Sequence, residues 1–66
     1  MLALAKTIQQ RMDELDMTQA DLARKTGLTT ANVAYIVNGK TKDPRLSSIV
    51  TIARALEMSI DELIGY

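Results

Sequence analysis

Apolar residues recur every three or four positions along most of the chain, and this spacing places them on one face of an α-helix. The first such stripe consists of Leu4, Ile8, Met12 and Leu15. Acidic residues follow near its end, where they oppose the helix macrodipole. The pattern therefore predicts a first helix that stops before Thr18.

Capping signals mark the next two helices. Thr18 and Asp21 resemble a capping box, with Asp in place of the usual Glu, and they open the second helix. Gly27 closes it, because glycine readily adopts the left-handed backbone conformation that ends a helix. Thr29 is a good N-cap for a third helix, which is expected to run to about Asn38.

Two further helices are predicted in the last third of the chain. Asp43 and Pro44 fit the N-cap and first helical residue of the fourth helix. Its expected buried stripe is Leu46, Ile49, Val50, Ala53 and Leu56. The β-branched residues of 48–52 would suit a strand, but the stripe fits a helix better and no partner strand is evident. Ser59 and Glu62 form a capping box for a short last helix, whose apolar residues are Ile60, Leu63 and Ile64.

Residues 18–44 combine the features of a helix-turn-helix. Two short helices meet at Gly27, and Ala23 is small where these helices must approach closely. The apolar residues that can face a common core are Leu22, Leu28, Val33 and Ile36. Because such a unit chiefly presents its second helix to the major groove, the chain is predicted to bind DNA.

Length and composition limit the alternatives. The 66 residues are expected to form one domain (1–66), and domains near this size bury only ~60% of the surface of the unfolded chain. Cysteine and histidine are absent, so neither disulfides nor a zinc site are expected. No apolar run reaches the ~20 residues that span a bilayer. Residues 1–5 are apolar, but the segment lacks a basic leader and Lys6 interrupts it, so a helix is favoured over a signal peptide. A cytoplasmic protein without membrane contact is expected.

Charge is distributed unevenly along the chain, although the net charge is zero. Residues 24–45 contain five basic residues and one acidic residue, a local net charge of +4. Residues 1–23 and residues 46–66 each carry a net charge of −2. Phosphates respond to a local basic patch within a Debye length of ~8 Å. The basic segment coincides with the expected DNA-binding surface; alternatively, its charges are simply solvated.

The combined pattern resembles the Cro/CI-like (XRE-type) helix-turn-helix domains of lambdoid phage repressors and related bacterial regulators. The resemblance covers nearly the whole chain and rests on Gln19, Leu22-Ala23, Gly27, Asn38-Gly39-Lys40, Pro44, Ala53, Ala55-Leu56 and residues 59–63. It implies an all-α, compact five-helix fold of the lambda-repressor type. It also implies a phage or prophage transcriptional regulator, usually a homodimer that represses by occupying a two-fold operator in a promoter.

Two departures from the family pattern stand out. Many phage members have a buried Arg–Glu pair between the first and third helices, and the matching residues here are Met12 and Val37. Replacing both members of a buried ion pair by apolar residues is often neutral or stabilising, so Met12 and Val37 are predicted to touch in the core. The chain also ends at Tyr66, which resembles Cro more than a full-length repressor, or else an excised N-terminal domain.

The residues expected to contact bases lie at the start of the third helix. They are Thr29, Thr30, Ala31, Ala34 and Tyr35. Their methyl groups suit contact with thymine, whereas no Arg, Lys or Gln is present for bidentate purine contacts, so DNA deformability is expected to contribute to specificity. Asn32 is able to bind adenine but lies slightly off the expected face.

Each residue that is expected to contact bases also has a purely structural interpretation. Tyr35 is either a core ring or a DNA contact, and the second is favoured because Val33 and its neighbours already fill the buried arc. Thr29 is an N-cap, a reader or both. Ala31 and Ala34 are alternatively nothing more than good helix formers.

A second group of residues is expected to bind phosphates. It comprises Gln19, Asn38, Lys40, Lys42 and Arg45. Gln19 begins the second helix, where backbone N–H groups favour anions. The family resemblance implies the same role for this glutamine, often braced by a glutamine where Thr30 stands here. Arg45 is a candidate for the minor groove, and Arg24 and Lys25 are equally well explained as solvated surface.

Catalytic functions are not supported. Gly39-Lys40-Thr41 resembles the end of a phosphate-binding P-loop, but position 34 is Ala34 where that motif needs glycine, and the segment follows a helix instead of a strand. Without cysteine or histidine there is neither a thiol nucleophile nor an imidazole base. The chain is expected not to be an enzyme and to need no cofactor, metal or small-molecule ligand.

The main alternative function is that of an antitoxin-type interaction module, which binds a partner protein and autoregulates its operon. The same fold serves both functions, so fold alone does not separate them. The apolar C-terminal end offers either a partner site or a dimer interface. Met58, Ile60 and Ile64 are assigned to a homodimer interface, and Leu63 is assigned to the core.

Overall fold

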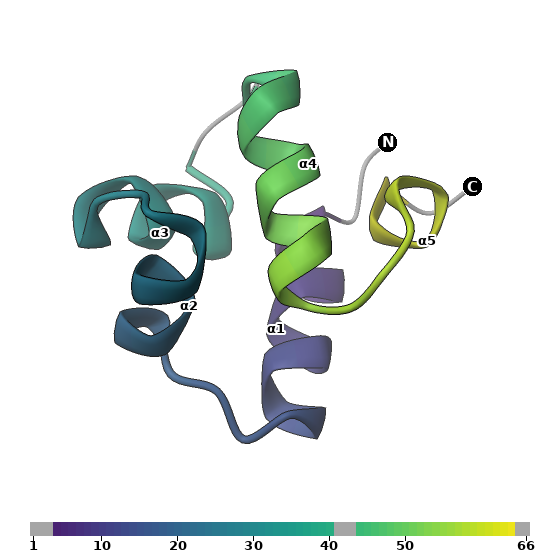
Figure 1. Cartoon of the computed structure of the whole chain (residues 1–66), viewed down its shortest axis with the longest axis horizontal. Helices are drawn as coiled ribbons and strands as arrows, with labels where there is room; N and C mark the ends of the chain where they lie inside the picture. Colours follow the sequence, from purple (N-terminus) through teal and green to yellow (C-terminus); the bar gives the residue numbers. More distant parts are fainter. Residues whose placement is uncertain (1–3, 41–43, 65–66) are drawn as a thin grey trace.

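The computed structural model describes residues 4–40 and 44–64, and these form five helices and no strand (Figure 1). The helices are α1 (Leu4–Glu14), α2 (Gln19–Thr26), α3 (Thr30–Val37), α4 (Leu46–Ala55) and α5 (Ile60–Ile64). The all-α prediction is confirmed, including the preference for a helix over a strand at residues 48–52.

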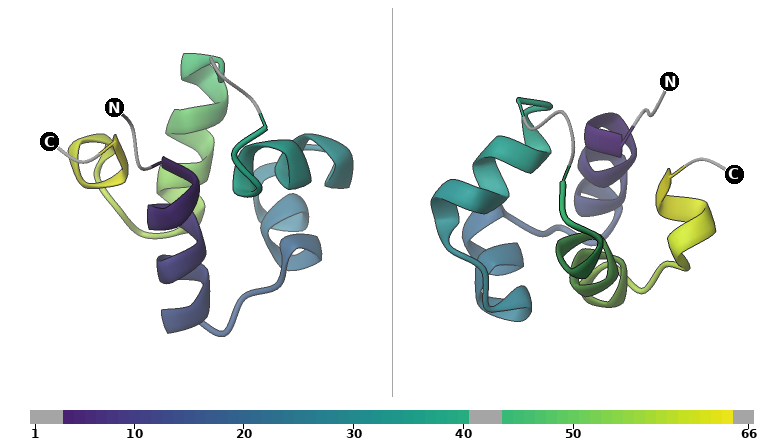
Figure 2. Two further views of the ribbon diagram at one scale, coloured as in Figure 1. Left: turned by 180° about the vertical axis from the view of Figure 1, so that it is seen from behind. Right: turned by 90° about the horizontal axis from the view of Figure 1, so that it is seen from above.

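The helices form one compact body of 26 × 22 × 18 Å. α2 and α3 pack against each other on one side of the molecule, while α5 lies on the other side (Figure 1). α1 joins the two sides by contacting α3 and α5, and α4 does so by contacting α2 and α5 (Figure 2). This arrangement leaves the outer face of α3 uncovered by another described helix.

A single apolar core holds the helices together. Its buried residues are Leu4, Ile8, Met12, Leu22, Ala23, Val33, Ile36, Val37, Ile52, Ala53, Leu56 and Leu63. Full burial of a leucine or isoleucine side chain contributes ~1.5–3 kcal/mol, so the fold rests mainly on these residues. Leu15 and Leu28, which the periodicity assigned to the core, are partly buried against it.

The buried stripe of α4 differs from the prediction at two positions. Leu46 was expected inside, but it is 68% exposed. Ile52 was left out of the expected stripe, yet it is only 1% exposed. The true stripe runs through Ile49, Ile52, Ala53 and Leu56, with Val50 at its half-buried border. Ile52 shares one helix face with Ile49, Ala53 and Leu56, but Leu46 also fits the 3.6-residue period, so the period alone does not choose between them.

The start of α4 was also predicted wrongly. Arg45 is the N-cap and Leu46 the first helical residue, whereas Asp43 lies outside the described residues. The backbone of Arg45 is extended (φ −64°, ψ 144°), so Pro44 precedes the helix and is not its first residue. The side chain of Arg45 makes no capping hydrogen bond.

The other predicted caps are confirmed. Thr18 Oγ1 accepts a hydrogen bond from the Asp21 N–H at 3.1 Å, and Asp21 Oδ2 accepts one from the Thr18 N–H at 3.0 Å. Ser59 and Glu62 exchange the same two bonds at 3.1 and 3.0 Å before α5. These reciprocal bonds satisfy backbone donors that a helix leaves free at its start.

Three other helix ends share a left-handed residue that closes the last turn. These residues are Asp16 (φ 55°), Gly39 (φ 71°) and Glu57 (φ 56°). After each one, an N–H bonds back to a carbonyl five residues earlier, as Met17 to Met12 (2.8 Å), Lys40 to Tyr35 (2.9 Å) and Met58 to Ala53 (2.9 Å). Only the glycine was predicted, because the other two positions lack the residue that usually marks this conformation.

The apolar substitution between α1 and α3 is accommodated in the core. Met12 and Val37 are both buried, with Val37 only 3% exposed, and they line the same small depression between α1 and α3. Their burial agrees with the predicted contact. Among residues 4–40 and 44–64, none of the helices is long and apolar enough to cross a membrane.

Candidate DNA-binding surface

The N-terminal half of α3 turns its polar side outward. Thr29 is the N-cap, and its hydroxyl oxygen accepts a hydrogen bond from the Asn32 N–H at 3.1 Å. Thr29 is nevertheless exposed, as are Thr30 and Ala31. Capping therefore leaves the Thr29 hydroxyl hydrogen free to donate outward.

Burial of the opposite side of α3 fixes which side chains reach solvent. Val33, Ile36 and Val37 lie in the core, as the sequence predicted. Tyr35 is consequently 56% exposed and is not a core ring. Ala34 is half-buried, which makes it the least accessible of the five predicted readers.

An open cleft separates α3 from the beginning of α4. It has a volume of about 510 Å³ and is lined by Leu28, Asn32, Tyr35, Ile36, Pro44, Arg45, Ser47 and Ser48. Asn32 and Tyr35 are three residues apart and therefore share one side of the helix. Asn32 thus lies beside Tyr35 on the accessible side of α3. The signal that reveals it is this three-residue spacing.

A second depression lies where α1, the start of α2 and the end of α3 meet. It measures about 340 Å³ and is lined by Gln9, Met12, Asp13, Met17, Thr18, Gln19, Val37 and Asn38. Two predicted phosphate ligands, Gln19 and Asn38, are therefore brought together although they are far apart in sequence. Gln9 had not been singled out by sequence, because nothing local marks a glutamine on the exposed side of α1.

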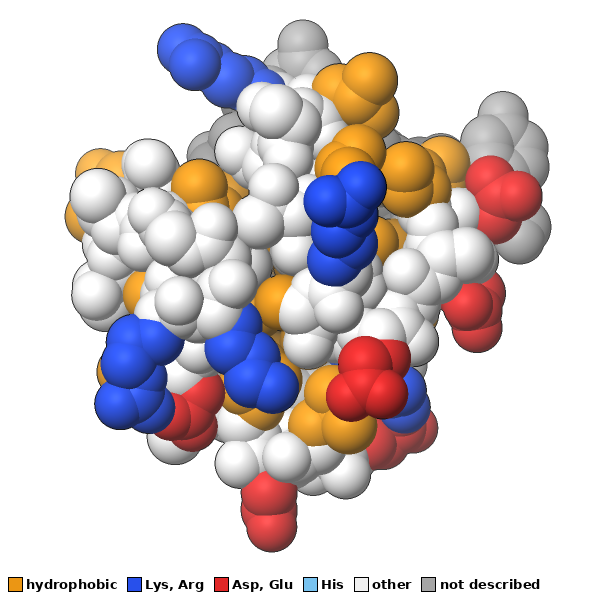
Figure 3. All heavy atoms as spheres, in the orientation of Figure 1, with side chains coloured by type: hydrophobic (Ala, Val, Ile, Leu, Met, Phe, Trp, Pro, Cys, Tyr) orange, Lys and Arg blue, Asp and Glu red, His pale blue; other side chains and the backbone are white. Residues whose placement is uncertain are grey.

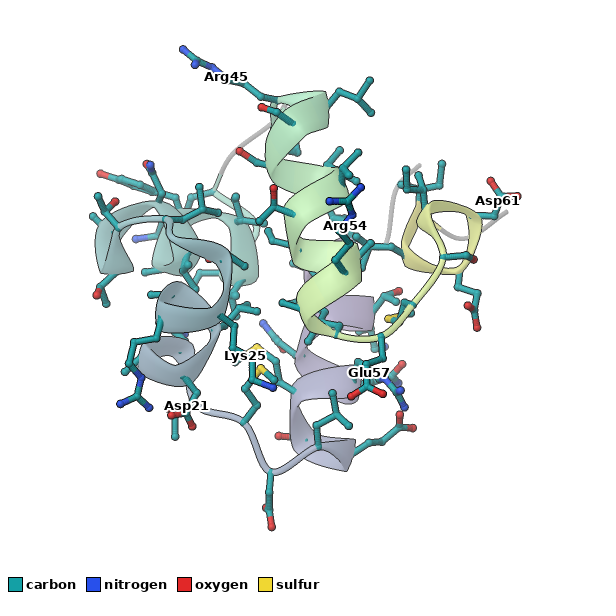
Figure 4. All side chains as sticks on the ribbon, viewed as in Figure 1. Asp21, Lys25, Arg45, Arg54, Glu57 and Asp61 are labelled. Carbon is teal, nitrogen blue, oxygen red and sulfur yellow. The ribbon has the colours of Figure 1, made fainter. Side chains whose placement is uncertain are left out.

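The remaining predicted phosphate ligands follow α3. Lys40 is exposed just after Gly39, whose left-handed backbone turns the chain at the end of the helix. Arg45 is exposed at the start of α4 and extends away from the body of the molecule (Figure 4). Lys42 lies outside the described residues.

Within residues 4–40 and 44–64, the basic residues lie at several separate places. Arg24 pairs with Asp21, so part of its charge is neutralised locally. Lys25 instead lines a depression with Arg54 and Glu57, between α2 and the end of α4. On the face seen in Figure 3, blue side chains are scattered over α2 and α4 and interspersed with red ones. Lys25 is exposed beside Arg54 and Glu57, a position that agrees with its alternative interpretation as solvated surface.

Hydrogen bonds lower the pKa of both capping carboxylates, Asp21 and Glu62. The Thr18 N–H, followed by the Thr18 hydroxyl, lowers the pKa of Asp21 from its ordinary value, and Arg24 acts in the same direction. The backbone and side chain of Ser59 lower the pKa of Glu62 in the same way, with a smaller contribution from Arg11. The negative charge of Asp21 near the first turn of α2 is thus balanced by Arg24.

The three predicted dimer residues differ in accessibility. Ile60 is 37% exposed, Ile64 is half-buried, and Met58 is half-buried against the core. Leu63, between them, is fully buried, which confirms its assignment to the core. Orange side chains gather over the upper part of α4 and over α5 in Figure 3, and exposed Leu46 lies at this end of α4.

Comparison with known proteins agrees with this geometry. A family model described as a Cro/C1-type HTH DNA-binding domain matches residues 7–66. An uncharacterized HTH-type transcriptional regulator of Bacillus subtilis, YozG, is 31% identical over 65 residues, which are 98% of this chain and 77% of that protein. An uncharacterized HTH-type transcriptional regulator of Coxiella burnetii is 29% identical over 98% of this chain, which spans only 30% of that protein.

Solved structures share the fold. A transcriptional regulator from Listeria innocua superposes with a TM-score of 0.83 at 28% identity, covering 98% of this chain and 60% of that one. The restriction-modification controller protein C.AhdI from Aeromonas hydrophila gives a TM-score of 0.84 at 23% identity, covering 91% and 89% of the two chains. The chain belongs to the Cro/C1-type helix-turn-helix family and is a DNA-binding protein of the HTH transcriptional regulator class.

Proposed function

We propose that this protein is a sequence-specific repressor that binds a two-fold operator as a homodimer and places α3 in the major groove. The observation that carries the proposal is the exposed N-terminal side of α3, with candidate phosphate ligands on both sides of it. Gln19 and Asn38 lie on one side, and Arg45 lies across the cleft from Tyr35.

Base recognition is assigned to the exposed side of α3. The methyl groups of Thr30 and Ala31 are suited to thymine C5-methyl groups, and the hydroxyls of Thr29 and Thr30 to base edges or phosphate. Tyr35 adds a large exposed side chain on the same helix. Asn32 joins this set, because its amide is suited to a bidentate contact with adenine. Ala34 contributes least, since it is half-buried.

Phosphate binding is assigned to residues that flank α3. Gln19 and Asn38 clamp one phosphate group from the start of α2 and the end of α3. Lys40 and Lys42 contact the neighbouring backbone, and Arg45 reaches the backbone or the minor groove from the start of α4. These contacts position the protein on the duplex without reading its sequence.

Dimerisation is assigned to Met58, Ile60 and Ile64. Ile60 is the most accessible of the three, so it makes the central contact with the same residues of a second copy. In a two-fold dimer on DNA, the two α3 helices must reach major-groove sites ~34 Å apart. Occupation of a promoter by such a dimer blocks transcription.

Selection from a pool of random DNA duplexes at near-physiological salt, followed by sequencing, tests the proposal. An enriched palindrome with half-sites ~10 bp apart is expected. An enriched single half-site would contradict the two-fold operator but retain sequence-specific binding. Recovery of no sequence, with binding that disappears as salt rises, would leave only non-specific attraction to phosphate and would contradict the proposal. Repression itself is tested by a reporter gene carrying the selected site in its promoter, whose expression is expected to fall when the protein is produced.

A further inference from the structure

A side chain of α1 holds the end of α3 in place. Gln9 Nε2 donates a hydrogen bond of 2.6 Å to the backbone carbonyl oxygen of Val37. Val37 is the last residue of α3, and 28 residues separate the two partners in sequence. This bond is therefore a tertiary link between α1 and the helix proposed to read DNA.

The bond completes the hydrogen bonding at the end of α3. The last four carbonyl groups of a helix lack partners within the helix itself. Three of them bond to the chain that follows, since Ala34, Tyr35 and Ile36 accept from the N–H groups of Asn38, Lys40 and Gly39. The fourth, that of Val37, accepts from Gln9. The Val37 carbonyl is thus the one terminal carbonyl of α3 whose partner, Gln9, comes from α1.

The surrounding contacts between α1 and α3 do not supply this directionality. Met12 on α1 and Val37 on α3 are buried apolar side chains, and apolar burial is non-directional. A hydrogen bond weakens steeply when its angle departs from linearity, so it restricts rotation and sliding of the helix that accepts it. Gln9 supplies this restriction where Met12 and Val37 cannot.

The same side chain lies beside the proposed phosphate clamp. Gln9, Gln19 and Asn38 line one depression, and Asn38 directly follows the Val37 carbonyl that Gln9 holds. We infer that Gln9 is a positioning residue for DNA recognition, which fixes α3 and Asn38 relative to α1 and α2 by holding the Val37 carbonyl. The inference rests on the proposed function in so far as it concerns DNA.

Gln9→Met tests the inference, because methionine keeps the length of the side chain and its helix propensity but cannot donate a hydrogen bond. Gln10→Met is the matched control, since Gln10 is a neighbouring exposed glutamine on the same helix. Two quantities are measured well below the melting temperature: amide hydrogen exchange of residues 38–40, and the ratio of affinities for the selected site and for an unrelated duplex.

Gln9→Met is expected to speed exchange at Gly39 and Lys40 and to lower the affinity ratio, each by about three- to tenfold, the effect of losing one hydrogen bond. Gln10→Met is expected to change neither. Unchanged exchange in Gln9→Met would overturn the inference whether or not the protein binds DNA. Faster exchange with an unchanged affinity ratio would overturn the role in recognition. Equal loss of affinity for both duplexes would show a direct phosphate contact and would also overturn it. If the unmodified protein binds no preferred site, the proposed function fails, while the exchange measurement still decides whether Gln9 holds α3.

Discussion

Arg11 Nε donates a hydrogen bond of 2.8 Å to the backbone carbonyl oxygen of Leu56 and so connects the last turn of α1 to the end of α4. Leu56 is the C-cap of α4, and its side chain is fully buried in the core. A cation at this position satisfies a terminal carbonyl and interacts favourably with the negative end of the helix macrodipole. Arg11 also pairs with Glu14 at 3.2 Å on its own helix.

Arg11→Met is expected to lower the free energy of unfolding by about 1–2 kcal/mol, because a hydrogen bond from a charged donor to the Leu56 carbonyl is lost from a partly exposed site. Urea denaturation followed by circular dichroism measures the change. Lys6→Met, an exposed charge removal on the same helix, serves as the control. Equal stability of the two variants would show that the Leu56 bond contributes nothing measurable.

Glu57→Gly is expected to stabilise the protein by about 0.5–1 kcal/mol, because Glu57 adopts a left-handed backbone that costs a residue with a side chain more than glycine. Part of the gain is offset by the greater entropy of glycine in the unfolded chain. The control is Glu57→Ala, which removes the same charge but keeps the unfavourable backbone conformation. A midpoint of denaturation that shifts equally in both variants would attribute the effect to charge instead of backbone conformation.

Stability is expected to fall in acid because of the two capping carboxylates. Their pKa values are lowered in the folded protein from ordinary values of 3.8 for Asp21 and 4.5 for Glu62, first through the backbone N–H groups of Thr18 and Ser59. A lowered folded-state pKa means that the stabilisation is complete above the ordinary value and is lost as pH falls through the folded-state value. Asp21→Asn and Glu62→Gln should therefore be less stable near neutral pH and lose less stability on acidification.

Denaturation midpoints between pH 2 and pH 7 check this dependence, with pH values chosen to bracket the carboxylate range. Asp13→Asn, which neutralises an exposed acidic residue without a capping bond to Thr18 or Ser59, is the matched control. An acid-induced decrease in the two capping variants as large as in the unmodified protein would exclude the caps as its source.

Two classes of DNA-binding variant are expected. Lys40→Ala should weaken binding to all duplexes and reduce the salt slope by about 1, because one cation no longer displaces counterions. Lys42→Ala should act in the same way. Thr30→Val or Tyr35→Leu should change the preferred sequence, with a discrimination of about 1–3 kcal/mol at the affected base pair.

Fluorescence anisotropy across a salt series, together with repeated selection for each variant, separates these classes. Arg54→Ala is a control, since Arg54 lies with Lys25 and Glu57 on the α2–α4 side of the molecule (Figure 4). If the Thr30 and Tyr35 variants lost only general affinity and kept the original sequence preference, the assignment of base readers would be wrong.

Ile60→Glu is expected to prevent dimerisation, because it places a charge at the centre of the proposed interface without disturbing the core. Affinity for the full palindrome should fall about tenfold or more, whereas affinity for a single half-site should stay the same. Leu46→Glu is the control, as Leu46 is an exposed apolar residue outside the assigned interface. Sedimentation equilibrium of both variants with and without DNA checks the assignment, which identical behaviour of the two would refute.

The parts of the fold that depend on local sequence could be predicted well. The caps at Thr18, Thr29 and Ser59 involve residues at most three positions apart, so the pattern that produces them is visible in the sequence. The core side of α3 could be predicted because Ile36 and Val37 lie three and four positions after Val33 and share one helix face with it. Features that depend on distant parts of the chain could not be read in this way.

The start of α4 and the bond from Gln9 are of the second kind. Whether Leu46 or Ile52 is buried depends on how α4 docks against α2 and α5, and both choices satisfy an apolar helix pattern. The partner of the Val37 carbonyl lies 28 residues away, at a glutamine with no distinctive neighbours. The location of Lys25 beside Arg54 likewise follows from the packing of α2 on α4.

An NMR titration of the amide-labelled protein with its selected duplex tests whether α3 binds the DNA, because it maps the residues whose signals change. The largest changes are predicted at residues 29–35, at Gln19 and at residues 38–40, with smaller changes at the start of α4. Changes concentrated on α5 and the end of α4, with the signals of α3 unaffected, would contradict the claim that α3 reads the DNA.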